Sequence, residues 1–135
     1  MLEEITDFIH KHKNKSLETQ DIIKLKDEFS NYANWLKNSD YYKEFYNNYL
    51  NIRAYTYRLN DSSQRLFYTF QEAVYAVDLA KLMRDEDSVK LNTIVYALVL
   101  NDCINEHLNI DIDEKIKAEA LEFYKNEQNR ISKEN

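Results

Sequence analysis

The chain of 135 residues contains neither glycine nor proline. Glycine is the usual residue where the backbone takes a positive φ, and proline is frequent at the corners of turns. Tight hairpins depend on glycine, so a sandwich of strands or an α/β fold without either residue would be very unusual. Helices joined by short loops of Asn, Asp and Ser need neither. The sequence therefore predicts an all-α fold.

A chain of this length can bury a proper core without metals or disulfides, and one domain is the natural expectation. Hydrophobic residues make up 44% and charged residues 31%, a balance typical of globular proteins. We expect a single helical domain over residues 1–130, built as a bundle of five to six helices. Residues 131–135 are predicted to be a frayed C-terminal tail.

Apolar residues recur with helical spacing in six segments, and Asn, Asp and Ser residues that can cap helices stand between them. One of these is Ser16, the predicted cap of the second helix. No glycine or proline enforces a break near residues 38–40, so the second and third segments form either two helices or one. The expected helices cover about 2–13, 17–37, 40–58, 62–84, 89–108 and 114–129.

The segment from Ile94 to Leu100 is apolar without interruption. A helix that is apolar on all sides is surrounded by other helices, so we expect the helix at about 89–108 to be the buried centre of the bundle. The run is too short to span a bilayer, and the N-terminus lacks the apolar segment of a signal peptide. The single cysteine, Cys103, cannot form an internal disulfide. These features predict a cytoplasmic protein with no membrane partner.

No strong catalytic or metal-binding pattern occurs in the sequence. His10 and His12 point to different sides of a helix, and Cys103 and His107 supply only two of the four ligands of a structural zinc site. Loops that cradle phosphate need glycine. Cys103 lies in an apolar segment beside two acidic residues, a setting that raises the pKa of a thiol. We therefore expect no enzyme activity, no metal and no other cofactor.

Eleven tyrosines and one tryptophan exceed what a core of this size needs, and Tyr, Trp and Arg dominate the hot spots of protein interfaces. We predict two interaction surfaces. The first is a partner-binding arc around the third helix, formed by Trp35, Tyr41, Tyr42, Tyr46, Tyr49, Arg53 and Tyr57. The second is a stripe on the fourth helix, either covered by neighbouring helices or forming an oligomer seam, and it consists of Tyr68, Tyr75, Leu79 and Leu82.

The leading functional hypothesis is a non-enzymatic helical protein that inhibits or regulates another protein. Its small size, its net charge of −6 and its frequent use of Asn, Lys, Ile and Tyr resemble accessory proteins of phages and mobile elements, including those that block host defence. In that case it would act in the host cytoplasm.

Two alternatives remain open. Arg53, Arg58 and Arg65, interleaved with tyrosines, favour a nucleic-acid-associated subunit, although the negative net charge weakens this interpretation. The stripe on the fourth helix favours a structural homo-oligomer, such as a homodimer.

Overall fold

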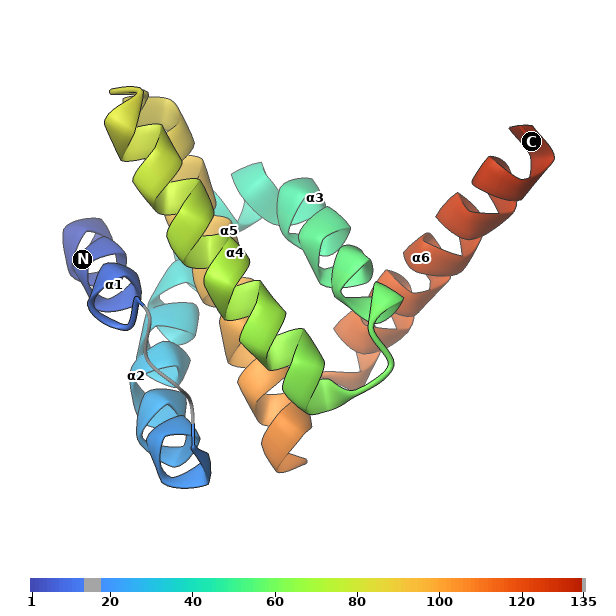
Figure 1. The fold of residues 1–135 in the computed structure, drawn as a ribbon, viewed down its shortest axis with the longest axis horizontal. Coiled ribbons are helices and arrows are strands. Elements are labelled where there is room, and N and C mark those ends of the chain that lie inside the picture. Colours follow the sequence, from blue (N-terminus) through green and yellow to red (C-terminus); the bar gives the residue numbers. More distant parts are fainter. Residues whose placement is uncertain (14–17, 135) are drawn as a thin grey trace.

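In the computed structural model, residues 1–13 and 18–134 are described, and they form six α-helices, one 3-10 turn and no strand (Figure 1). This confirms the all-α prediction. The predicted cap Ser16 lies outside the described residues. In chain order the elements are α1 (Leu2–Lys11), α2 (Thr19–Lys37), α3 (Asp40–Tyr55), η1 (Thr56–Arg58), α4 (Ser62–Leu82), α5 (Glu86–Leu108) and α6 (Glu114–Glu134).

Helix α5 is the centre of the bundle, as predicted. It packs against α1, α2, α3 and α4, and every residue from Thr93 to Asn105 is buried. The helix begins earlier than expected because the Asp85 carboxylate caps it, accepting a 3.1 Å hydrogen bond from the Ser88 amide. It ends at Leu108, and the capping residue Asn109 has a left-handed backbone with φ of 57°.

Helices α2 and α3 are separate elements. Asn38 and Ser39 turn their side chains back to cap the end of α2, with Asn38 Nδ2 donating to the Asn34 carbonyl at 2.8 Å and Ser39 Oγ to the Leu36 carbonyl at 2.6 Å. The backbone of Ser39 is extended, which starts α3 in a new direction. Side-chain caps thus make the break that no glycine or proline enforces.

In the described part of the chain, three residues other than glycine have a positive φ. They are Arg84 at 56°, Asn109 at 57° and Asp111 at 48°. Arg84 lies between α4 and α5, and the other two lie between α5 and α6. Left-handed backbone costs a residue with a Cβ atom about 1 kcal/mol, least for Asn and Asp. The chain therefore turns without glycine at a small cost in stability.

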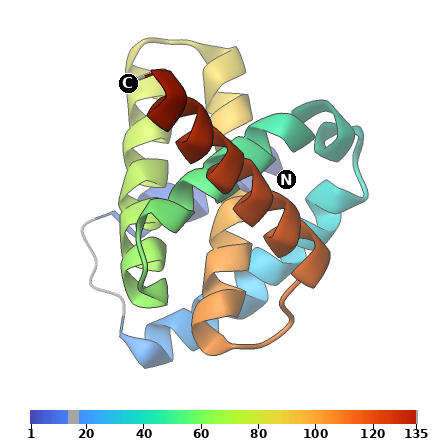
Figure 2. The same ribbon diagram turned by 90° about the vertical axis from the view of Figure 1, so that its right-hand side faces the viewer.

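Helix α6 crosses over α3 and then extends away from the bundle (Figures 1 and 2). Only Ile116 and Ala120 are buried in it. The helix continues to Glu134, past its expected end near residue 129, so residues 131–134 are helical and exposed where a frayed tail was predicted. Arg130 pairs with Glu127 and Glu134 in this last stretch, which supports a solvated helix.

Candidate functional site

The predicted aromatic arc around α3 is divided between surface and core. Trp35 is 37% exposed, and its ring centroid lies 6.2 Å from that of Tyr41. Tyr41, Tyr42 and Tyr46 are half-buried and pack against the core. The Tyr46 hydroxyl donates a 2.5 Å hydrogen bond to Glu119 of α6. Most of this arc serves to hold α3 between α5 and α6.

Two members of the predicted arc are not on the surface. Tyr49 is fully buried and Arg53 is 2% exposed, so neither is accessible to a partner of the folded chain. The prediction that Tyr49 and Arg53 belong to a partner-binding arc is therefore corrected. The physical reason is that α3 contacts both α5 and α6, so two neighbouring helices cover parts of its wide apolar face.

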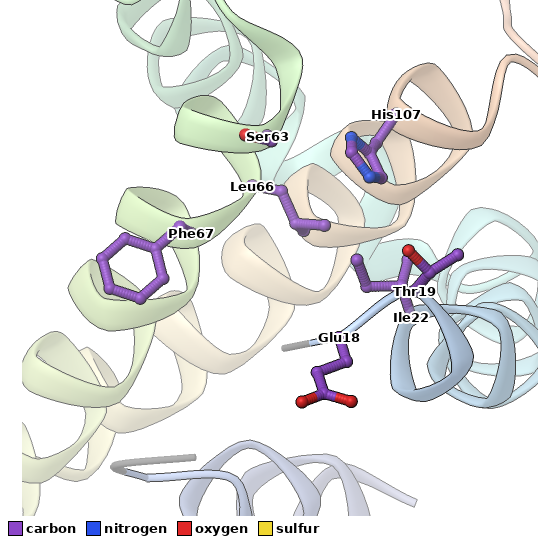
Figure 3. Close-up of a pocket in the computed structure, with 7 residues that line it drawn as sticks. All are labelled: Glu18, Thr19, Ile22, Ser63, Leu66, Phe67 and His107. Atoms are coloured by element: carbon purple, nitrogen blue, oxygen red, sulfur yellow. The ribbon is translucent and has the colours of Figure 1, made fainter. Parts of the chain in front are cut away.

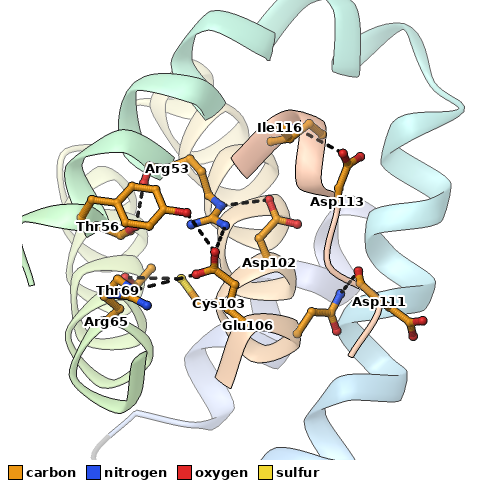
Figure 4. Close-up of polar contacts among 12 residues, drawn as sticks. Arg53, Thr56, Arg65, Thr69, Asp102, Cys103, Glu106, Asp111, Asp113 and Ile116 are labelled. Carbon is orange, nitrogen blue, oxygen red and sulfur yellow. Dashed lines mark hydrogen bonds and ion pairs between the residues drawn. The ribbon is translucent and has the colours of Figure 1, made fainter. Parts of the chain in front are cut away.

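Arg53 is instead the centre of a buried ionic network between α3 and α5 (Figure 4). Its Nη2 donates a 2.7 Å hydrogen bond to Glu106 Oε1, and its Nε lies 3.3 Å from Asp102 Oδ2. The Tyr49 hydroxyl donates to the same Asp102 oxygen. Charged side chains are almost never fully buried unless they are paired, and this arrangement pairs one guanidinium with two carboxylates.

Glu106 collects further donors at the edge of this network. Its Oε1 accepts a 2.9 Å hydrogen bond from the Tyr57 hydroxyl, and its Oε2 lies 3.8 Å from Arg65 Nε. The guanidinium carbons of Arg53 and Arg65 lie 5.1 and 5.4 Å from the centre of the Tyr57 ring. Tyr57 is thus held between two arginines and one carboxylate inside the chain's own structure.

The two carboxylates of the network differ in their electrostatics. Burial raises the pKa of Asp102, and the opposing effects of Arg53 and Tyr49 only partly offset it. Burial also acts to raise the pKa of Glu106, but Arg53, Tyr57 and Arg65 outweigh it and hold that pKa below its ordinary value of 4.5. Glu106 is therefore the carboxylate that the network keeps ionised.

Cys103 and His107 lie on the same helix but in different surroundings. Cys103 is buried, its Sγ is 4.0 Å from Thr69 Oγ1, and burial raises its pKa to about 11. This agrees with the direction expected from the sequence. His107 Nδ1 instead lies 3.3 Å from Ser62 Oγ at the rim of the bundle. Within residues 1–13 and 18–134, no three His, Cys, Asp or Glu side chains gather as metal ligands.

A pocket of about 530 Å³ opens between the first turns of α2 and α4 and the end of α5 (Figure 3). Ser62 Oγ lies 3.3 Å from His107 Nδ1. Catalysis by such a serine–histidine pair also needs a carboxylate that orients the histidine and free donors that stabilise the oxyanion of the intermediate. In the first turn of α4, the Ser63 amide donates a 3.2 Å hydrogen bond to the cap Asp61. The pocket is lined by Glu18, Thr19, Ile22, Ser63, Leu66, Phe67 and His107.

The arginines of the nucleic-acid interpretation are all engaged with carboxylates. Arg53 and Arg65 face Glu106, and Arg58 Nη2 pairs with Glu72 at 2.5 Å while its guanidinium stacks 3.9 Å from the centre of the Tyr55 ring. Binding to phosphates requires cations that are free to replace condensed counterions. These three side chains do not form a free basic patch.

The predicted stripe on α4 is exposed along its whole length. Tyr68 is 45% exposed, Tyr75 69%, Leu79 40% and Leu82 81%. The opposite side of α4 carries the buried core residues of that helix. Of the two outcomes left open by the sequence, coverage by a neighbouring helix does not occur in the described chain. Both views place α4 at the outside of the molecule (Figures 1 and 2).

The sequence analysis missed part of the α4 stripe and part of the ionic network around Arg53. Met83, 70% exposed, extends the stripe on α4, and Asp102 and Glu106 are the hidden partners of Arg53. The sequence did contain a signal for this network. Arg53 lies on an aromatic helix face, and Asp102 and Glu106 follow the apolar run from Ile94 to Leu100. Buried charges imply partners of opposite charge.

Comparison with protein-family models, curated proteins and solved structures gives no match for this chain. Among the helices of the described residues, none combines the length and apolar character needed to cross a membrane.

Proposed function

We propose that this chain is a non-enzymatic helical binding protein that docks another protein chain on the outer side of α4. We call this surface the α4 face and define it as Tyr68, Tyr75, Leu79, Leu82 and Met83. The observation that carries the proposal is the exposure of these large apolar side chains along one side of a helix whose other side is fully used in the core.

The energetics favour a protein as the occupant of this face. Burying a large apolar side chain contributes about 1.5–3 kcal/mol, and the α4 face places several in a row. Scattered exposed apolar residues are ordinary, but a contiguous patch marks an interaction surface. Inhibition or regulation of that partner is the most specific form of this function.

A capture experiment with charge-matched variants tests the proposal. The double variant Tyr75→Asp/Leu82→Asp disrupts the α4 face. The control Ile23→Asp/Ile131→Asp adds the same charge at side chains that are 54% and 41% exposed on α2 and α6. The wild type and both variants are each immobilised on beads and incubated with lysate of the protein's native cell. Bound proteins are quantified by mass spectrometry. Loss of a bound protein only with the α4-face variant supports the proposal, whereas equal recovery with all three proteins contradicts it.

If the partner were a nucleic acid, the same capture experiment would give a different result. Its binding would fall steeply as salt is raised and would depend on Arg58, the most exposed of the three arginines considered. Binding to the α4 face is apolar and would persist at high salt.

A further inference from the structure

We infer that the α4 face binds a second copy of this chain, with the two α4 helices packed antiparallel around a twofold axis at Tyr75. This inference rests on the proposed function, since it names the occupant of the same face. Three features of the described residues carry it: the spacing of the apolar side chains, the charges beside them and the exposed area.

The spacing of the face suits a helix that pairs with its own copy. Tyr68, Tyr75 and Leu82 are seven residues apart, and Leu79 follows Tyr75 by four. Repeats of this kind keep one stripe in contact along two nearly parallel helix axes, here over about 20 Å. In an antiparallel pair centred on Tyr75, that residue meets itself and Tyr68 meets Leu82 of the second copy. Tyr68, Tyr75 and Leu82 then each have an apolar partner, and the twofold axis repeats the contacts, as in an isologous interface.

The charges beside the stripe are compatible with this arrangement. In the antiparallel register centred on Tyr75, Gln71 is level with Leu79 of the second copy and Asp78 is level with Glu72. Glu72, at the edge of the stripe, is already neutralised by Arg58. Asp78 is likewise paired, with Lys13 at 3.1 Å and His10 at 3.4 Å. No unpaired like charges meet along the seam.

The exposed area is in the range of a real interface. The exposed fractions of the five residues of the α4 face correspond to roughly 600 Å² on each copy, against about 800 Å² per partner in a standard interface. Polar side chains at the rim supply the remainder. Helix α4 lies in front of α5 in Figure 1 and at one edge of the bundle in Figure 2.

The net charge makes the association respond to salt in a specific way. Each copy carries −6, so two copies repel each other at long range while the seam itself is apolar. Raising the ionic strength screens that repulsion. The dimer should therefore tighten with added salt, which is the opposite of nucleic-acid binding.

Sedimentation equilibrium of the purified full chain over a wide range of concentration is the first test. We expect a monomer–dimer equilibrium, strengthened by salt and weakened at least tenfold by Leu82→Asp. Ile131→Asp, with the same charge change on α6, should leave it unchanged. A monomer at every concentration and salt level would overturn the inference, and so would a dimer that Leu82→Asp does not weaken.

Thiol cross-linking tests the antiparallel register. Cys103 is buried, so an introduced cysteine is the reactive one. With a short bismaleimide, Tyr75→Cys should cross-link to itself, whereas Tyr68→Cys and Leu82→Cys should cross-link efficiently only when mixed. Efficient self-linking of Leu82→Cys would indicate a parallel pair and contradict the register. A chain that stays monomeric but loses a captured protein with Tyr75→Asp/Leu82→Asp would refute self-association while supporting the proposed function.

Discussion

The guanidinium of Arg53 donates a 2.7 Å hydrogen bond to the Glu106 carboxylate across the α3–α5 interface, with side-chain exposures of only 2% and 5%. With Asp102 and Tyr49, this pair fixes how α3 sits on the central helix. Ionic groups in such a position are costly to separate, because each is left without solvent or a partner.

Replacement of Arg53 by methionine should destabilise the protein by about 3–5 kcal/mol, because the ionised Glu106 and the buried Asp102 carboxyl would lose their cation. Urea denaturation followed by far-ultraviolet circular dichroism measures the effect. Arg130→Met is the matched control, since Arg130 also pairs with two carboxylates but is 56% exposed. A similar stability for both variants would mean that the buried network contributes little.

The effect of Glu106→Gln should depend on pH. The folded state holds the pKa of Glu106 below 4.5, so its stabilising contribution is present above that pH and is lost as pH falls through the folded-state pKa. We expect the variant to be less stable than the wild type by about 3 kcal/mol at pH 7. The difference should shrink in urea titrations performed at successively more acidic pH.

A matched comparison isolates this effect from general acid destabilisation. Glu122→Gln changes an exposed side chain of α6, and it should unfold like the wild type at each pH. A constant difference between wild type and Glu106→Gln from neutral to acidic pH would contradict the assignment of Glu106 as the ionised member of the network.

Cys103 should resist thiol reagents in the folded protein. Burial raises its pKa to about 11, so the thiol stays protonated at neutral pH and is shielded from solvent. Reaction with a chromogenic disulfide should be slow in buffer and fast in urea. Ile23→Cys adds an exposed thiol that should react at once, and rapid loss of both thiols without denaturant would disprove the burial of Cys103.

Asn109 tests how a chain without glycine makes its turns. Its φ of 57° favours glycine, so Asn109→Gly should leave stability unchanged or raise it by up to about 1 kcal/mol. Asn109→Val should lower stability by about 1–2 kcal/mol, because a β-branched side chain opposes the left-handed conformation. Thermal unfolding of the three proteins measures the order, and equal stability of the Val and Gly variants would contradict it.

Local features of the sequence determined the helices and most of their ends. The lack of glycine and proline restricted the fold class, and the apolar run from Ile94 to Leu100 identified the central helix, as its burial in α5 confirms. Asp61 and Asp85 cap α4 and α5 through residues only two or three positions away, so these helix starts depend on local sequence alone.

Only the tertiary structure decided which tyrosines and arginines face inward. Periodicity assigned Tyr49 and Arg53 to the same wide face as Tyr42 and Tyr46, but it does not say how many helices cover that face. The partners of Arg53 are about fifty residues away in the chain, and their pairing depends on the docking of α3 on α5. The exposure of Tyr75 and Leu82 was likewise undecided in the sequence, because an apolar stripe has the same spacing whether or not another helix covers it.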